Sequence, residues 1–320
     1  MKDKMAKLIE ITGKALSGEW GNDDNTGNGI PVLRTTNFTN EGIVNYNNVV
    51  TRIIEKKKIE EKYLRKGDIV IEKSGGSDKQ PVGRVVYFDG PENTYLFNNF
   101  TGLLRVKDQA KWYPRYVFYS LFSNYHRGGT RAFQNKTTGL HNLKIDDFVS
   151  RCEVTEAGIN EQIAACKRMD RVNDIIRMHQ QQLQKLDELV KARFVEMFEN
   201  ISYPTERFSR FIESLTSGSR GWAKYCVDDG SECFITIKNV KNCCISTNNM
   251  QPINAPRNAE AIRTKVKEGD LLISITADLG RTGVVSKEIA EHGAYINQHL
   301  TCIRVDRKII NPLFIAYYLD

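Results

Sequence analysis

The sequence feature that most constrains the fold is a short phrase that occurs twice. "GDIVIEKSGG" begins at Gly67 and "GDLLISITAD" begins at Gly269, so the two copies lie 202 positions apart (269 − 67 = 202). Under the same offset "VLRTTNF", which begins at Val32, aligns with "FITIKNV", which begins at Phe234. Separate segments that share one offset indicate an internal duplication.

Two further matches follow in the same order, and their offset falls slowly, as loops of unequal length require. "FNNFTGLLRV" ends at Val106 and "INQHLTCIRV" ends at Val305, now 199 apart (305 − 106). "YPRYVFYSL" ends at Leu121 and "NPLFIAYYL" ends at Leu319, now 198 apart (319 − 121). Each copy contains short strand-like runs between Gly- and Asn-rich turns, followed by a helix that begins at a proline. We therefore predict an α+β fold with two repeated mixed α/β domains.

The segment between the copies predicts a long helix. It runs from Ile159 to Asn200 without a glycine or a proline. Hydrophobic residues recur in it at the seven-residue spacing of a coiled coil. The seam residues are Met169, Ile176, Leu183, Val190 and Met197, with Leu186 on the neighbouring line. Such a seam cannot bury itself, so we expect it to pack against another helix.

The repeat and the helix together predict the domain boundaries. We expect a first domain at 1–150, a spacer helix at 151–203 and a second domain at 204–320. The second domain stops before the counterparts of the first copy's C-terminal part and of a second long helix. Because that helix is missing, we expect the seam to pair with another chain.

Composition narrows the class of protein. The 320 residues suffice for about two domains, and the net charge of +7 moderately favours contact with a polyanion. No apolar run approaches the ~18 residues of a membrane span, and the N-terminus lacks the apolar core of an export signal, so we expect a cytoplasmic protein. The seven cysteines form no C-x-x-C pair, which predicts reduced thiols and no zinc site.

Two segments could indicate catalysis, and each has a structural alternative. Asp68, Glu72 and Lys73 combine carboxylates with a lysine, as metal-dependent nucleases do. Only the aspartate persists in the second copy, as Asp270, which favours a turn before a strand. "NPLF" at Asn311 approaches the Asn-Pro-Pro-Tyr/Phe motif of adenine methyltransferases, but the first copy begins a helix at this point. We therefore predict no catalytic residue.

The order of domain, long helix and repeated domain resembles the specificity (S) subunit of type I restriction–modification systems. "TTGLHNLKIDDF" contains Gly139, Asn142 and Leu143, similar to the Gly-x-x-x-Asn-Leu stretch of such subunits, and Glu161-Gln162 opens the helix. The prolines that the family tends to carry between these two motifs are absent. The resemblance covers almost the whole chain.

The resemblance implies a non-catalytic role in a larger complex. Each domain would read one half of a bipartite site on double-stranded DNA. The helix would set their separation and dock methyltransferase (M) subunits, and through them restriction (R) subunits. S-adenosylmethionine, ATP and Mg²⁺ would belong to these partners, in a bacterial or archaeal cytoplasm. The alternative is a protein-interaction or dimerisation module built on a coiled coil, without sequence-specific DNA reading.

Candidate DNA contacts follow from the residue types that suit base edges and phosphates. Arg and Lys suit guanine, and Asn and Gln suit adenine. Both copies place such residues in matching polar loops. The candidates are Arg34, Asn37, Lys73, Ser74, Lys79, Gln80, Arg84, Asn98 and Asn99 in the first copy, and Thr236, Lys238, Asn239, Thr276, Arg281, Asn297, Gln298 and His299 in the second. Tyr95, Phe97 and Tyr295 are expected in the core strands rather than on the DNA.

Overall fold

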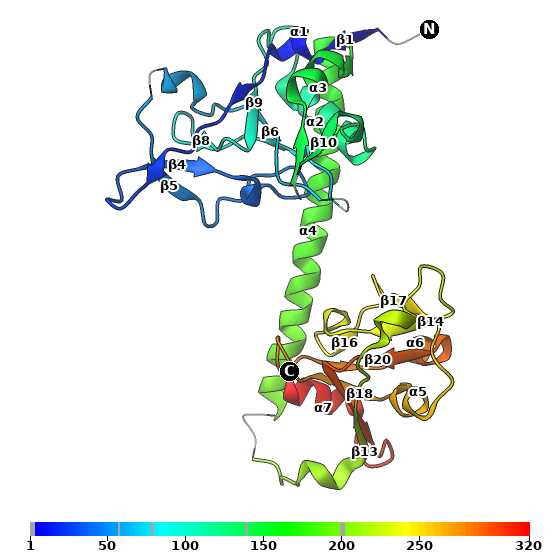
Figure 1. Ribbon diagram of the computed structural model, residues 1–320. Coiled ribbons are helices and arrows are strands. Elements are labelled where there is room, and N and C mark those ends of the chain that lie inside the picture. Colours follow the sequence, from blue (N-terminus) through cyan, green and yellow to red (C-terminus); the bar gives the residue numbers. More distant parts are fainter. Residues whose placement is uncertain (1–3, 57, 78–79, 138–139, 199–201) are drawn as a thin grey trace. The chain divides into compact units, whose positions relative to one another are not determined.

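The computed structural model describes residues 4–56, 58–77, 80–137, 140–198 and 202–320 (Figure 1). They form two compact units, Met1–Arg177 and Met178–Asp320, which we call the first and second unit and describe separately. The boundary between them falls inside the long helix, so the predicted boundaries at 150/151 and 203/204 stay a prediction. No described helix is both long enough and apolar enough to cross a membrane.

The first unit contains two four-stranded sheets with helices and smaller strand pairs around them. One sheet has the order β2-β9-β6-β7 and is antiparallel throughout, and the other has the order β3-β5-β4-β8, with β4 and β8 parallel. The strands are β2 (Leu16–Ser17), β3 (Asn22–Asp23), β4 (Ile30–Leu33), β5 (Val50–Ile53), β6 (Ile69–Glu72), β7 (Val85–Tyr87), β8 (Leu96–Phe97) and β9 (Thr101–Leu104). The pairs β1 (Met5–Lys7) with β12 (Glu153–Thr155) and β10 (Gln134–Thr137) with β11 (Leu140–Leu143) complete the strands, and the helices are α1 (Leu8–Thr12), α2 (Pro114–His126) and α3 (Ile145–Arg151).

The second unit repeats this plan. Its four-stranded sheet has the order β13-β21-β18-β19, and a three-stranded sheet has the order β17-β14-β20, with β14 and β20 parallel. The strands are β13 (Ile212–Ser217), β14 (Glu232–Ile235), β15 (Val240–Lys241), β16 (Cys244–Ile245), β17 (Gln251–Ile253), β18 (Leu271–Ser274), β19 (Thr282–Val284), β20 (Ala294–Ile296) and β21 (Leu300–Val305). The helices are α5 (Ala259–Thr264), α6 (Lys287–His292) and α7 (Pro312–Leu319).

The matching strand orders confirm the internal duplication. The aligned segments occupy the same places, since β6 corresponds to β18, β9 to β21, and the parallel pair β4–β8 to β14–β20. Helices α2 and α7 both begin at a proline in the first turn, as predicted. The predicted α+β class with a long helix between two repeats is also confirmed.

The central strand of each unit lies between two hydrophobic cores. In β6, Ile69 and Ile71 pack into one cluster of buried residues and Val70 packs into another. In β18, Leu271 and Leu272 divide in the same way. Alternate side chains of a strand point to opposite faces, and both faces are covered here. This explains why the sequence of these strands is an apolar run rather than an alternating one.

The Gly-Asp pair of each copy forms the turn that begins the central strand. Asp68 accepts two hydrogen bonds from Arg105, from Nε at 2.7 Å and Nη2 at 2.6 Å. Asp270 accepts the same two from Arg304, at 2.7 and 2.5 Å. Both aspartates also accept the backbone N–H three residues earlier, at 2.7 and 2.8 Å. The turn interpretation of the repeated aspartate is therefore correct, because its oxygens are used inside the fold.

Helix α4 (Ile159–Phe198) is one continuous element in Figure 1. The predicted end at Asn200 lies outside the described residues. In the first unit, the buried Gln162 accepts the Tyr113 N–H at 2.8 Å, and Asp170 pairs with Arg115 at 2.8 Å. In the second unit, the Phe194 ring lies 5.5 Å from the Phe314 ring.

The coiled-coil seam of α4 is exposed. Met169, Ile176, Leu183, Leu186, Val190 and Met197 keep between 43% and 63% of their surface accessible. The helical periodicity is thus confirmed, and the described residues leave most of the seam uncovered.

Candidate nucleic-acid interface

A tight turn occupies the same place in both units and connects β8 to β9 and β20 to β21. In the first unit the Thr101 N–H donates to the Asn98 carbonyl at 3.0 Å, and in the second the Leu300 N–H donates to the Asn297 carbonyl at 3.0 Å. We call Asn98–Phe100 and Asn297–His299 the first and second tip.

Each tip is bonded to the end of the neighbouring central strand. The Lys73 N–H donates to the Phe100 carbonyl at 2.7 Å, and the Ile275 N–H donates to the His299 carbonyl at 3.0 Å. Because the backbone bonds are the same, the two units display their tip side chains from equivalent scaffolds.

A glycine permits a close approach of the chain to each tip. A Cβ atom on Gly18 would lie 2.1 Å from the Asn98 carbonyl oxygen, and one on Gly218 would lie 2.0 Å from that of Asn297. Any larger residue would displace the turn, since the obstacle is backbone. The two glycines are therefore part of what places the tips.

Two of the predicted contact residues serve the fold instead. Asn37 and Asn239 are 2% and 3% exposed. The Asn37 side chain accepts the Arg34 N–H at 2.9 Å and donates to two carbonyls. The Asn239 side chain makes the equivalent set of bonds, beginning with the Thr236 N–H at 3.0 Å. Both amides close a short 3₁₀ turn, so we leave them out of the interface.

Arg84 is likewise held inside the first unit. Its guanidinium donates to both carboxylate oxygens of Glu72 at 3.0 Å and to the carbonyls of Phe38 and Thr35. The Glu72 side chain is only 3% exposed. Burial alone would lower the pKa of Arg84, but the bonds to Glu72 outweigh burial and hold the pKa above its ordinary value. This arginine is therefore a charged structural group.

Its counterpart Arg281 is in a different situation. The N–H of Ser274 donates to the Arg281 carbonyl at 2.9 Å, just as the N–H of Glu72 donates to that of Arg84 at 2.8 Å. Serine replaces the buried glutamate, and Arg281 instead pairs with Asp278 at 2.7 Å. The two side chains are 39% and 63% exposed. Arg281 is thus able to reach a ligand.

The second unit gathers four predicted residues into one polar surface. The Thr276 hydroxyl lies 2.6 Å from His299 Nδ1, and the Gln298 amide nitrogen lies 2.9 Å from His299 Nε2. Arg281 stands at the other end of the 275–281 loop, which Ser274 closes by accepting the Arg281 N–H at 2.9 Å. Asn297 is mostly buried and accepts the His299 N–H at 3.1 Å. This surface offers hydroxyl, imidazole, amide and guanidinium groups together.

The first unit gathers a smaller set. Asn99 is exposed in the tip, and Lys73 donates to the Ser17 hydroxyl at 2.7 Å beside it. Burial lowers the pKa of the Lys73 amine. Gln80 donates to Asn40 at 3.2 Å.

A cavity of about 290 Å³ lies beside the 3₁₀ turn Thr35–Asn37, and residues 75–77, Gln80 and Arg84 also line it. Ser74 bridges to β11 through Asn142. Lys79 lies outside the described residues.

The positions of the remaining candidates neither support nor exclude a contact with DNA. Asn98 is 5% exposed, and its carbonyl Oδ1 has no hydrogen-bond partner among the described residues. Arg34 and Thr236 are half-buried at the 3₁₀ turns, and Lys238 is exposed on the second of them. These residues stay predictions.

Sequence reasoning missed Phe100. This side chain is 47% exposed at the first tip, in the position that His299 occupies in the second. The alignment of the two segments ending at Val106 and Val305 already placed the two residues opposite each other.

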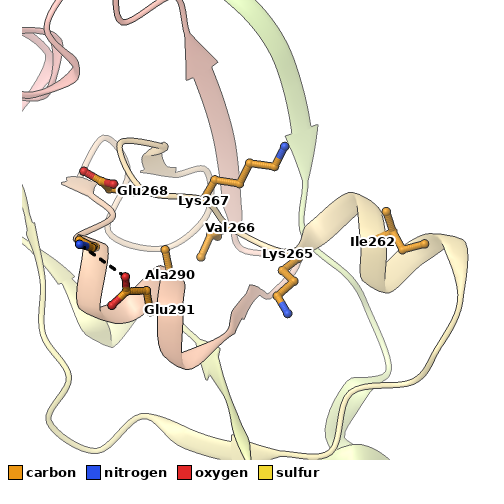
Figure 2. A pocket seen from close by; sticks show the side chains of 8 residues that line it. Ile262, Lys265, Val266, Lys267, Glu268, Ala290 and Glu291 are labelled. Atoms are coloured by element: carbon orange, nitrogen blue, oxygen red, sulfur yellow. Dashed lines mark ion pairs between the residues drawn. The ribbon is translucent and has the colours of Figure 1, made fainter.

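A separate shallow cavity of about 510 Å³ lies at the opposite end of β18 from the 275–281 loop. Figure 2 shows its lining, in which a dashed line marks an ion pair of Glu291. The partner is Lys287, at 3.6 Å. None of the predicted contact residues lines it. Nor do the described residues include a group of three His, Cys, Asp or Glu side chains placed to hold a metal ion.

Comparisons with known proteins agree with this architecture. The family model described as "Type I restriction modification DNA specificity domain" matches residues 4–188. No curated protein matches the sequence. A solved structure titled as the structural basis of complex assembly and conformational transition of the type I R-M system is 15% identical, with a TM-score of 0.50, and the match covers 100% of this chain and 79% of that one.

Two further solved structures are similar. One is the HsdS subunit of Thermoanaerobacter tengcongensis, 15% identical over 99% of this chain and 78% of that one, with a TM-score of 0.40. The other is the type I restriction-modification S subunit of M. genitalium, 14% identical over 99% and 76%, with a TM-score of 0.49.

Proposed function

Because this chain belongs to the family of type I restriction modification DNA specificity domains, we propose that each of its two units reads one block of a bipartite DNA site through its tip and the adjoining loop. The chain is a DNA-recognition subunit and is not itself an enzyme. Phosphate contacts give such a protein affinity and register, whereas contacts to base edges give it sequence specificity.

One observation carries this proposal. The two tips share two backbone hydrogen bonds but have different side chains, Asn99 and Phe100 in one unit and Gln298 and His299 in the other. A fold that keeps its scaffold while it varies the exposed residues suits two readers of different sequences. A purely structural repeat would have no use for this difference.

The partners follow from the family. The chain acts in a type I complex with DNA and with modification and restriction subunits. We propose that the exposed seam of α4 takes part in this assembly, either with a methyltransferase subunit or with a second long helix. S-adenosylmethionine, ATP and Mg²⁺ would be bound by the partner subunits. A bacterial or archaeal cytoplasm is the proposed location.

The test identifies the DNA target from the sites that the complex methylates. The chain is mixed with its cognate methyltransferase subunit, S-adenosylmethionine and randomised DNA, and the methylated sites are sequenced. Two short blocks with a fixed gap support the proposal. A single or palindromic block would mean that only one unit reads DNA. No methylation, together with no retention of DNA at low salt, would favour the interaction module.

A further inference from the structure

We propose that Phe100 is a specificity-determining residue that packs on the 5-methyl group of a thymine, while Asn99 beside it bonds an adenine edge. The first unit would thus read an A·T base pair in the major groove. This inference rests on the proposed function and deepens it, because it assigns a base pair to one tip.

The first observation is that Phe100 is exposed on a rigid support. Its carbonyl accepts the N–H groups of both Lys73 and Ser74, at 2.7 and 3.2 Å. The Thr101 hydroxyl and N–H both donate to the Asn98 carbonyl, at 2.8 and 3.0 Å. The backbone of the tip is therefore fixed by four hydrogen bonds, while Phe100 itself stays 47% exposed. Covering an exposed aromatic ring on a fixed turn stabilises a complex with the partner that covers it.

The second observation is that the fold does not require this ring. His299 occupies the same place in the second unit, where two of these four bonds recur, from the Ile275 N–H to its carbonyl and from the Leu300 N–H to the Asn297 carbonyl. Its ring is held by Thr276 and Gln298. The hydrocarbon ring at one tip and the hydrogen-bonding ring at the other suit different chemical groups of a ligand. The fold does not dictate the side chain at this position, so this residue can determine sequence specificity.

The surroundings of Phe100 suit DNA rather than an apolar partner. Asn99 is exposed next to it, and Lys73 lies against the tip with its amine bonded to Ser17. A lysine suits a phosphate and an asparagine suits the N6 and N7 atoms of adenine. In the major groove thymine is the base that presents a methyl group, and an apolar side chain such as Phe is its usual contact. Together these residues match the two edges of one A·T pair.

The test uses the assembled complex and DNA that carries its methylation-defined site. Each thymine of both blocks is replaced in turn by uracil, which pairs identically and lacks only the methyl group. Binding is measured by fluorescence anisotropy for the wild type, for Phe100→Ala and for Ile43→Ala. Ile43 is the matched control because it is also 47% exposed but bridges to Tyr87 of β7, which pairs with Ile69 at the end of β6 away from the tip.

We expect one uracil position to weaken wild-type binding about fourfold, the equivalent of one buried methyl-sized group. Phe100→Ala should weaken binding to the thymine site by a similar factor and should be insensitive to uracil at that position. Ile43→Ala should behave as the wild type. Because Phe100 is exposed, its truncation should leave the melting temperature unchanged, which separates loss of contact from loss of fold.

Two results would overturn the inference while the proposed function stands. One is a wild-type complex that recognises a split site but ignores uracil at every position. The other is a Phe100→Ala complex that keeps the wild-type sensitivity to uracil. If instead the wild type defines no split site at all, the proposed function itself has failed.

Discussion

Glu72 and Arg84 form a buried, doubly hydrogen-bonded ion pair at the end of β6, and the aligned residues Ser274 and Arg281 do not. The difference between glutamate and serine at this aligned position thus gives the two arginines different roles. The first is locked against the 3₁₀ turn at Thr35. The second extends from an exposed loop. This difference gives the first two predictions.

Removal of the Glu72 carboxylate should destabilise the first unit. Glu72→Ala leaves the Arg84 guanidinium without its counter-ion in a largely buried place, and breaking such a pair costs about 3 kcal/mol or more. We expect a clear fall in the melting temperature measured by calorimetry. Ser274→Ala at the aligned position is the control and should cost much less. An unchanged melting temperature in Glu72→Ala would contradict the structural role.

Substitution of one arginine should affect DNA binding, and substitution of the other should affect stability. Arg281→Ala should weaken DNA binding about tenfold, the order of one good base contact, and should leave the melting temperature unchanged. Arg84→Ala should lower the melting temperature, because Glu72 is then buried without a partner. Anisotropy titrations over a range of salt concentrations check the first effect. A smaller salt slope in Arg281→Ala would assign its contact to phosphate. Full DNA affinity in that variant would remove Arg281 from the interface.

The stability of the first unit should depend on Glu19 in a defined pH range. Burial raises the pKa of the Glu19 carboxyl, but Lys56 and Lys62, at 2.6 and 2.5 Å, lower it more, so it lies below its ordinary value of 4.5. A lowered pKa adds stability above pH 4.5 that is lost as the pH falls through the lowered value. Glu19→Gln should therefore cost about 1 kcal/mol at pH 7, and the difference from the wild type should shrink below pH 4.5. Urea unfolding at several pH values measures this, with the exposed Glu41→Gln as control. A difference that stays constant at every pH, down to acid at which the Glu19 carboxyl of the wild type is protonated, would exclude an ionic origin.

The seam of α4 should act in assembly and not in the stability of the isolated chain. Leu183 and Leu186 are 63% and 56% exposed, so Leu183→Gln with Leu186→Gln should leave the melting temperature unchanged. The same change should weaken self-association or binding of the methyltransferase subunit, because both would bury the seam. Analytical ultracentrifugation at several concentrations is the measurement, and Lys185→Gln, between the two leucines, is the control. A wild-type chain that remains a monomer at all concentrations and also fails to bind that subunit would contradict this role.

Much of the architecture could be predicted because it depends on local sequence patterns and on an internal repeat. The two aligned Gly-Asp turns, the proline-initiated helices and the long helix are all local signals. The core positions of Phe97 and Tyr295, 0% and 5% exposed, were also predictable from strand composition. The order of the strands in space required the structure.

The interface was harder to predict, because burial and partners depend on residues distant in the chain. Asn37 resembles a base-reading asparagine in sequence, yet its amide closes a 3₁₀ turn with residues up to Asn47. Arg84 and Arg281 follow equivalent glycines and differ through the residue at the end of the preceding strand. Phe100 was overlooked because aromatic residues in strand-rich segments usually belong to the core.

The most direct test of the account exchanges the two tip residues. Phe100→His and His299→Phe complexes are each supplied with S-adenosylmethionine and randomised DNA, and the methylated sites are sequenced beside those of the wild type. We expect each exchange to alter one block of the split site, a different block in each case, and to leave the other block and the gap unchanged. Sites identical to those of the wild type in both variants, or changes in both blocks from one exchange, would contradict the claim that each unit reads its own half through its tip.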